Sequence, residues 1–134
     1  MNLETVFNFI KEKRGYDYPF VYKLFNGIPL SEDDLHVDGS LYLTNTNITS
    51  LPNNLTIVGD LDLASTEIST LPDNLTVDGW LDIRNTNIIS IPNNLRVNRT
   101  IFISHTPLTR RYFKFQINKM IENKGGYCNG DIIK

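Results

Sequence analysis

The sequence predicts an α+β repeat fold, a parallel β-solenoid of about four coils with helical caps at the N- and C-terminal ends. The main observation is a period of 20 residues, because Pro52, Pro72 and Pro92 each open nearly the same phrase. Within each phrase apolar and polar residues alternate, which indicates short strands with one buried face. A fixed period this short is typical of stacked coils, so we expect function on a repetitive surface and not in a cleft.

The chain of 134 residues is long enough for one domain with a modest core. We divide this domain into a helical N-terminal cap (residues 1–27), the 20-residue repeats (28–108), a C-terminal capping helix (109–124) and a tail (125–134).

The N-terminal segment has helical spacing where the repeat has not yet begun. Leu3, Val6, Phe7 and Ile10 fall at i, i+3, i+4 and i+7, which predicts a helix, and residues 19–26 predict a second short helix that ends before Gly27. Half of the aromatic residues lie in residues 1–30, and we expect them to plug the open end of the stack.

Each coil is expected to contain two short strands. The phrase L-x-L forms one, and its inward residues fall in the columns Leu41/Leu43, Leu61/Leu63, Leu81/Ile83 and Ile101/Ile103. The phrase L-x-V-x-G forms the other and ends at Gly39, Gly59 or Gly79, which suit a corner or bulge. Arg99 replaces this glycine in the last copy, so that corner should be built differently.

The repeat ends where a second helical pattern begins. Phe113, Ile117, Met120 and Ile121 form an apolar stripe along the predicted capping helix, and Gly125-Gly126 ends it. The following residues, 127–134, are expected to be loosely held.

The phrase L-x-L-x-x-T-x-I-x-x-L-P resembles the leucine-rich repeat, in a short bacterial or bacteriophage version with a 20-residue coil. The resemblance covers about residues 28–108 and implies a repeat architecture. The family usually has asparagine at the positions of Thr46, Thr66, Thr86 and Thr106, so a threonine ladder should replace the buried amide ladder. The regular second strand favours a flattened two-sheet solenoid over a curved horseshoe.

Charge is distributed unevenly along the chain although the formal net charge is only −2. Residues 31–95 contain one basic residue against ten acidic ones, whereas residues 96–134 contain eight basic against two acidic. Cys128 is the only cysteine, which fits a reducing compartment. The chain start lacks the pattern of a secretory signal. We therefore expect a cytoplasmic protein, in a bacterium or an infected host cell.

The outward positions of the L-x-L strands are the predicted partner-binding site. Its candidate residues are Tyr42, Asp60, Asp62, Trp80, Asp82, Arg84 and Phe102. Stacking should place Trp80 beside Asp60, and Asp62 beside Asp82. An outward Trp forfeits apolar burial, and this residue type often dominates interface energetics. The alternative is that residues 127–134 cover Trp80.

The aspartates admit four interpretations: a solvated acidic face, a basic protein partner, a bound cation, or a carboxylate pair of the kind used by retaining glycosidases. We expect no metal, no cofactor and no catalytic residue, because a strand face offers no evident pocket. His36 and His105 are expected at the surface, and Cys128 has no visible activating group.

The sequence therefore favours a non-enzymatic protein-binding module, as a monomer or weak homo-oligomer, whose acidic and aromatic face binds a basic partner protein. The resemblance to phage-type repeat proteins implies a sharper version, an inhibitor or decoy of a host protein. The alternative is a nucleic-acid-associated protein that uses the basic C-terminal end, with Tyr112 and Phe115 nearby for stacking. The candidate residues for that alternative are Arg96, Arg99, Arg110, Arg111, Lys114 and Lys119.

Overall fold

The computed structural model describes residues 18–134, which fall into two compact units divided between Asp34 and Leu35. The predicted helix at Leu3–Ile10 lies outside the described residues. Among those that are described, every helix is too short or too polar to cross a membrane.

The first unit contains the short helix predicted before Gly27. Helix α2 spans Phe20–Asn26, and Gly27 ends it in the left-handed conformation with φ of 65°. The Lys23 ammonium is buried and lies 2.7 Å from Asp34 Oδ2. Burial opposes ionisation of Asp34, but hydrogen bonds from Lys23 and Ser31 outweigh it and lower the pKa of this carboxyl group.

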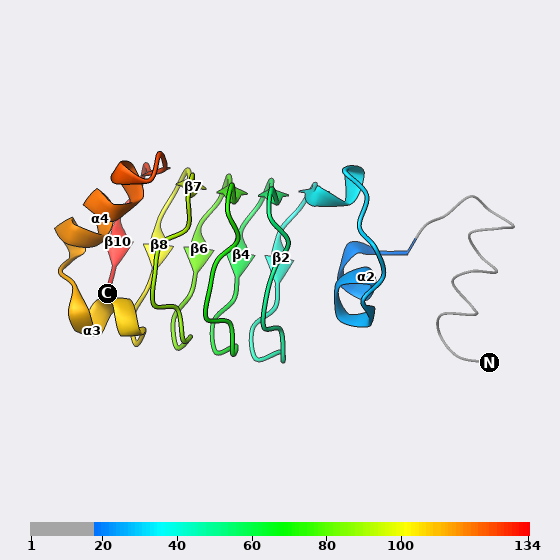
Figure 1. The fold of residues 1–134 in the computed structure, drawn as a ribbon, viewed down its shortest axis with the longest axis horizontal. Coiled ribbons are helices and arrows are strands. Elements are labelled where there is room, and N and C mark those ends of the chain that lie inside the picture. Colours follow the sequence, from blue (N-terminus) through cyan, green and yellow to red (C-terminus); the bar gives the residue numbers. More distant parts are fainter. Residues whose placement is uncertain (1–17) are drawn as a thin grey trace, which may run out of the picture. The chain divides into compact units, whose positions relative to one another are not determined.

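The second unit is a parallel β-solenoid built from two five-stranded sheets, which confirms the predicted fold class and its two-sheet form (Figure 1). A short 3₁₀ segment, η1 (Asp33–Leu35), precedes its first strand. The first sheet has the order β1-β3-β5-β7-β9, with strands His36–Val37, Thr56–Ile57, Thr76–Val77, Arg96–Val97 and Tyr127–Cys128. The second sheet has the order β10-β8-β6-β4-β2, with strands Ile132–Ile133, Ile101–Phe102, Leu81–Asp82, Leu61–Asp62 and Leu41–Tyr42.

Successive coils stack in register at the 20-residue period. Leu41 pairs with Leu61, Leu61 with Leu81, and Leu81 with Ile101. Leu61 and Leu81 are fully buried, as are the corresponding residues of the first sheet. The core therefore lies between the two sheets, and a coil buries its aliphatic side chains only because neighbouring coils cover them.

Asparagines brace the turn after each proline. Asn54, Asn74 and Asn94 adopt left-handed backbone angles, with φ between 55° and 66°. The Asn74 side-chain amide donates to Asn54 Oδ1 at 2.7 Å, and Asn94 donates to Asn74 at 2.8 Å. Asparagine suits both tasks, because it tolerates the left-handed region and carries both a donor and an acceptor.

The threonines brace the turns as expected, with one turn carbonyl to each hydroxyl, but they do not form a ladder from one coil to the next. Each threonine hydroxyl donates within its own coil to the carbonyl three residues earlier, as Thr66 does to Leu63 and Thr86 to Ile83. A single hydroxyl satisfies one local carbonyl and has no second donor with which to reach the next coil. The amide ladder between coils is present, but at another corner.

The repeated glycines form the corner at which coils approach most closely. Gly59 N–H donates to the Gly39 carbonyl, and Gly79 N–H to that of Gly59. A Cβ atom on Gly79 would lie 2.7 Å from the Gly59 carbonyl oxygen, so the corner excludes any larger residue there. Arg99 does not change how the next coil approaches this corner, because Gly130 N–H donates to the Arg99 carbonyl at 3.1 Å, as Gly79 N–H does to that of Gly59.

The C-terminal end departs from the sequence prediction in two ways. Two helices, α3 (Pro107–Arg111) and α4 (Lys114–Asn123), replace the single predicted helix of residues 109–124. The hydroxyl of Thr106 accepts from Thr109 N–H, and Pro107 occupies the first helical turn, so the helix starts earlier than expected. The backbone is then extended at Tyr112 and Phe113, which separates the two helices.

Residues 127–134 are not a loose tail. Their strands β9 and β10 pair with β7 and β8 and complete a last coil on both sheets. Ile132 continues the leucine column, and Cys128 continues the column of Val97. The pattern escaped detection because helices α3 and α4 interrupt the 20-residue period before this coil.

Helix α4 contacts this last coil and buries Ile117 and Ile121 (Figure 1). Phe113, which we predicted to belong to the same apolar stripe, is instead 67% exposed. It precedes the helix in extended conformation, so it does not share the helical face of the two isoleucines.

Candidate functional site

The predicted partner-binding residues come together on the outer face of the second sheet. We call this surface the aromatic face and define it by Tyr42, Asp60, Asp62, Trp80, Asp82, Arg84 and Phe102. Strand alternation turns the leucines inward and these residues outward. Register places Tyr42 next to Asp62, Asp62 next to Asp82, and Asp82 next to Phe102.

Trp80 joins the two outer aromatic residues into one cluster. Its ring lies 6.3 Å from that of Tyr42, and 6.1 Å from that of Phe102 in an edge-to-face arrangement. Strand β4 lies between β2 and β6, so Tyr42 and Trp80 start about 10 Å apart along the sheet. The indole must therefore extend across β4 to meet the tyrosine.

Residues 127–134 do not fold over Trp80, as the alternative interpretation held. Strand β10 pairs edge-on with β8 and extends the same sheet. Trp80 is half-buried by residues of its own face, and Tyr42 remains 63% exposed. The aromatic cluster is consequently open to solvent along its outer side.

Asp60 and Asp62 accept hydrogen bonds from the backbone. Asp60 Oδ1 accepts from Trp80 N–H at 2.9 Å, so this carboxylate links two coils and fixes the start of β6. Asp62 Oδ1 accepts from Ala64 N–H at 2.9 Å. Both carboxylates are half-exposed, and within residues 18–134 neither forms an ion pair.

Asp82 differs from Asp60 and Asp62 in its burial, because it is only 2% exposed although it occupies an outward position of its strand. Arg84 binds it through Nε and Nη2, with the shortest contact at 2.6 Å. The hydrogen bond and charge of Asp82 raise the pKa of the Arg84 guanidinium, and Asp62 adds to the effect. The guanidinium carbon also lies 5.3 Å from the centre of the Phe102 ring.

These contacts limit what the face can do chemically. Asp82 is covered and bound to Arg84, so the pair Asp62/Asp82 does not present two free carboxylates. The described residues contain no group of three or more His, Cys, Asp or Glu that could hold a metal ion. What the face does offer is a row of aromatic rings, two accessible carboxylates and one anchored guanidinium.

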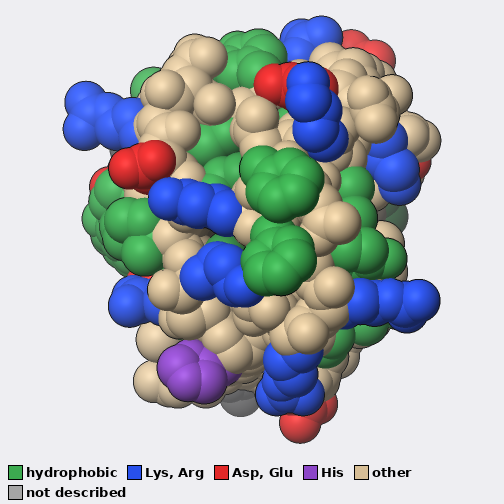
Figure 2. Space-filling view, turned by 90° about the vertical axis from the view of Figure 1, so that its left-hand side faces the viewer, with side chains coloured by type: hydrophobic (Ala, Val, Ile, Leu, Met, Phe, Trp, Pro, Cys, Tyr) green, Lys and Arg blue, Asp and Glu red, His purple; other side chains and the backbone are tan. Residues whose placement is uncertain are grey.

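The basic residues of the alternative site lie elsewhere and do not form one cluster. Arg96 lies on the outer face of the first sheet, and Arg99 at the following corner. Lys114 and Lys119 form ion pairs with Asp131 at 3.6 Å and Glu122 at 3.1 Å. Viewed end-on, the end that carries α3 and α4 exposes hydrophobic side chains with Lys and Arg side chains around them (Figure 2).

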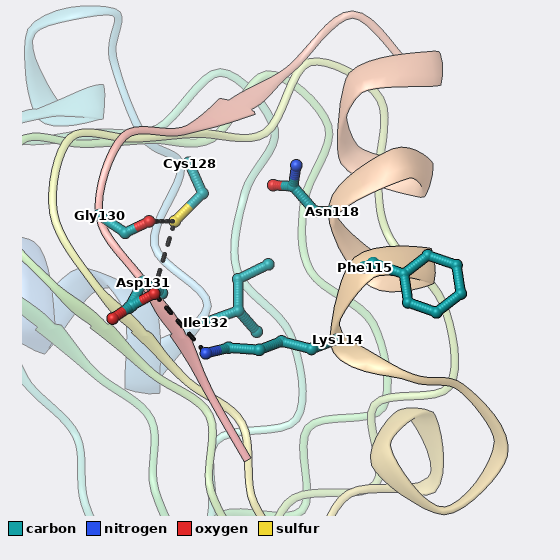
Figure 3. A pocket seen from close by; sticks show the side chains of 7 residues that line it. All are labelled: Lys114, Phe115, Asn118, Cys128, Gly130, Asp131 and Ile132. Carbon is teal, nitrogen blue, oxygen red and sulfur yellow. Dashed lines mark hydrogen bonds and ion pairs between the residues drawn. The ribbon is translucent and has the colours of Figure 1, made fainter.

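A separate open hollow of about 460 Å³ lies between α4 and the last coil (Figure 3). Lys114, Phe115 and Asn118 line one side, and Cys128 and Ile132 the other. Burial raises the pKa of the Cys128 thiol, whose sulfur lies 3.3 Å from the Arg99 carbonyl oxygen. The thiol is therefore held in its unreactive protonated form.

His36 and His105 lie where the sequence predicted. His36 is exposed on the first sheet, with Nε2 3.1 Å from Asp38. His105 occupies a turn at φ of 58°, in the position that Asn45 and Asn85 hold in other coils.

Sequence reasoning missed the asparagine ladder and the exposure of Phe113, although it named Phe115 as a stacking residue. The repeat itself indicated the ladder, since asparagine recurs at the fourth position of each L-P-x-N phrase. Nothing in the sequence indicated that Phe113 pairs with Phe115, because a helix assigned across residues 109–124 placed Phe113 on the apolar stripe.

No protein-family model matches this chain, and no significant match was found among curated proteins or among solved structures.

Proposed function

We propose that this chain is a non-enzymatic protein-binding module whose aromatic face binds a partner surface rich in Lys and Arg. The position of Trp80 carries this proposal. Its outward indole bridges Tyr42 and Phe102, so three aromatic side chains from three coils form one continuous surface. Trp, Tyr and Arg are the residue types that most often dominate binding energy at interfaces.

Charge supports a basic partner. The aromatic face carries three carboxylates against the single guanidinium of Arg84, which is already engaged by Asp82. Asp60 and Asp62 therefore keep an unbalanced negative charge beside exposed π systems. A Lys or Arg side chain gains from both, through charge attraction and through cation–π contact.

The mechanism is recognition with little rearrangement. Phe102 lies on β8 and Trp80 directly precedes β6, and both of these strands are hydrogen-bonded on both sides, whereas Tyr42 lies on the edge strand β2. Asp60 also fixes the backbone of Trp80. Such preorganisation lowers the entropy lost on binding.

The sharper form of the proposal rests on the resemblance to short bacterial and bacteriophage leucine-rich repeats. By that analogy, the module acts in the cytoplasm of a bacterium or an infected cell as an inhibitor or decoy of a host protein. The acidic run of residues 31–95 supports this form, because it matches a partner that normally binds an anionic surface.

The experiment uses the fact that Trp80 is the only tryptophan, so its emission reports on the aromatic face alone. Poly-lysine and an Arg-rich peptide should shift this emission saturably, with an effect that weakens as salt rises, whereas poly-glutamate should not. Tyr42→Ala and Asp62→Asn should each weaken binding about tenfold, the size expected for loss of a hot-spot contact.

Ile89→Ala is the matched control for Tyr42→Ala, because Ile89 is as exposed as Tyr42 but lies outside the aromatic face. The proposal would be contradicted if Trp80 emission did not change on addition of the cationic peptides. It would also be contradicted if Tyr42→Ala bound these peptides as tightly as Ile89→Ala does. A pull-down with wild type, Trp80→Ala and Asp62→Asn then identifies the native partner. Asp62 is the better variant for this purpose, since replacing buried Asp82 would also strand Arg84.

A further inference from the structure

The C-terminal end carries a second aromatic group that the aromatic face does not include. Phe113 and Phe115 are 67% and 68% exposed, and their rings stack with centres 6.1 Å apart and planes only 7° from parallel. Neither ring belongs to the repeat or covers the core. Two large apolar side chains left in water at one place mark a binding surface more often than an accident of folding.

A small cationic hollow adjoins this pair. It has a volume of about 110 Å³ and is lined by Thr109, Arg110, Arg111, Tyr112, Phe113 and Lys134. Three of the six residues are cationic, and none is Asp or Glu. Within residues 18–134, neither arginine forms an ion pair. The hollow therefore suits an anionic group.

The hollow and the ring pair form one surface, because Phe113 belongs to both. The Lys134 ammonium lies 5.9 Å from the centre of the Phe113 ring and donates to the Tyr112 carbonyl, so it is held beside the stack. We call this surface the C-terminal face and define it by Arg110, Arg111, Phe113, Phe115 and Lys134. The end-on view of the end that carries α3 and α4 shows exposed hydrophobic side chains with Lys and Arg side chains around them (Figure 2).

We propose that the C-terminal face binds single-stranded nucleic acid, with a phosphate in the cationic hollow and a base stacked on the Phe113–Phe115 pair. Parallel exposed rings offer a flat π surface, and every base has a matching flat face. An acidic peptide fills the hollow with a carboxylate but leaves the ring faces without a planar partner. A duplex keeps its bases stacked inside and cannot use the rings.

The site is confined to this end of the solenoid. The coils of residues 35–95 contain seven acidic residues against one basic residue and repel further phosphates, so only a few nucleotides are bound. If the three cations neutralise three phosphates, about 0.7 counterion is released for each phosphate of a single strand. A plot of the logarithm of the association constant against the logarithm of the salt concentration should then have a slope of about −2.

The test is fluorescence anisotropy with labelled oligo(dT) and oligo(U) of eight nucleotides, added to the full chain at low salt. Binding is expected with the salt slope above. Phe115→Ala should weaken it about tenfold, in line with the loss of one base-stacking contact. The double variant Arg110→Ala/Arg111→Ala should bind the oligonucleotide more weakly, and its salt slope should be shallower, below about 1 in magnitude.

Two matched controls separate these effects from general ones. Ile89→Ala removes an exposed apolar side chain elsewhere, and Arg96→Ala removes an exposed arginine that does not line the hollow. Both should bind like wild type. Circular dichroism and melting verify that all variants fold, as expected for exposed positions.

Absence of binding at low salt would overturn the proposal, as would variants of Phe115 and Arg110/Arg111 that bind like the controls. Stronger binding to poly-glutamate, or to vesicles containing phosphatidylglycerol, would assign the surface to another class of partner. Trp80 emission should stay unchanged on oligonucleotide binding. A change in Trp80 emission would indicate that the oligonucleotide binds at the aromatic face and not at the C-terminal face. This outcome is distinct from failure of the protein-binding proposal, which is tested with the cationic peptides.

Discussion

The aromatic face and the C-terminal face both expose aromatic rings, but they differ in what holds the rings and in the charge around them. On the aromatic face, Trp80 projects from a backbone that Asp60 fixes, and carboxylates surround it. On the C-terminal face, Phe113 and Phe115 project from the extended link and first turn of α4, beside arginines. The comparison shows that stacking organises residues within the repeat, whereas the segment outside it is free to present a different chemistry.

The same contrast holds between an inner coil and the last coil. Inner coils have a coil on each side, and Leu61, Leu63 and Leu81 of their L-x-L strands are fully buried. The last coil, with β9 and β10, has a coil on one side and α4 against it. A helix covers the interior less completely than another coil, which leaves the open hollow beside Cys128.

The largest expected effect is on the inner core. Leu81→Ala should lower the free energy of unfolding by about 3–5 kcal/mol, because a cavity opens between two coils that cannot collapse around it. Ile132→Ala should cost less, about 2–3 kcal/mol, since the last coil can relax toward the hollow. Urea unfolding measures both. Equal losses at the two positions would mean that the last coil is packed as tightly as the inner ones.

The corner glycines give the next largest effect. Gly79→Ala should destabilise the chain by about 1–3 kcal/mol, because the new Cβ meets the Gly59 carbonyl oxygen and the Asp60 side chain. Gly39→Ala is the matched control, since no atom of residues 18–134 lies within 4 Å of the added carbon. It should be neutral or slightly stabilising. Similar melting temperatures for the two variants would contradict the close approach of coils at this corner.

The threonine column offers an intermediate test. Thr86→Val removes the hydroxyl that donates to the Ile83 carbonyl at 2.8 Å, and about 1 kcal/mol should be lost. Thr106→Val should cost about 2 kcal/mol, because Thr106 donates to Ile103 and also caps α3 through Thr109 N–H. Thermal unfolding of both variants measures the difference. A smaller loss at Thr106 would show that the helix cap contributes nothing.

The smallest effect concerns the thiol of the last coil. Because burial raises the pKa of Cys128 above 9.0, its thiolate fraction at pH 8 is low, and iodoacetamide should react more slowly than with unfolded chain. By linkage, the protonated thiol adds stability that is present below pH 9 and lost as pH rises through the folded pKa. Cys128→Ser should reduce this fall in the free energy of unfolding at high pH, because the serine hydroxyl does not ionise in this range. Alkylation as fast as in urea would show that the last coil opens readily.

Sequence by itself determined the parts of the fold that repeat. The period, the two strands per coil, the inward leucines and the outward row from Tyr42 to Phe102 all follow from alternation at a 20-residue spacing, because each coil must bury the same face. The helix before Gly27 followed from local spacing and its glycine stop in the same way. These features need only neighbours in sequence or one period away.

Only the tertiary structure decided the rest. It buried Asp82 against Arg84, carried the Trp80 ring across β4, and brought residues 127–134 back as the last coil. It also split the capping helix at Phe113 and so exposed the phenylalanine pair. Each of these outcomes depends on a side chain's reach or on contacts that fall outside the 20-residue period, where the repeat no longer dictates which residues meet.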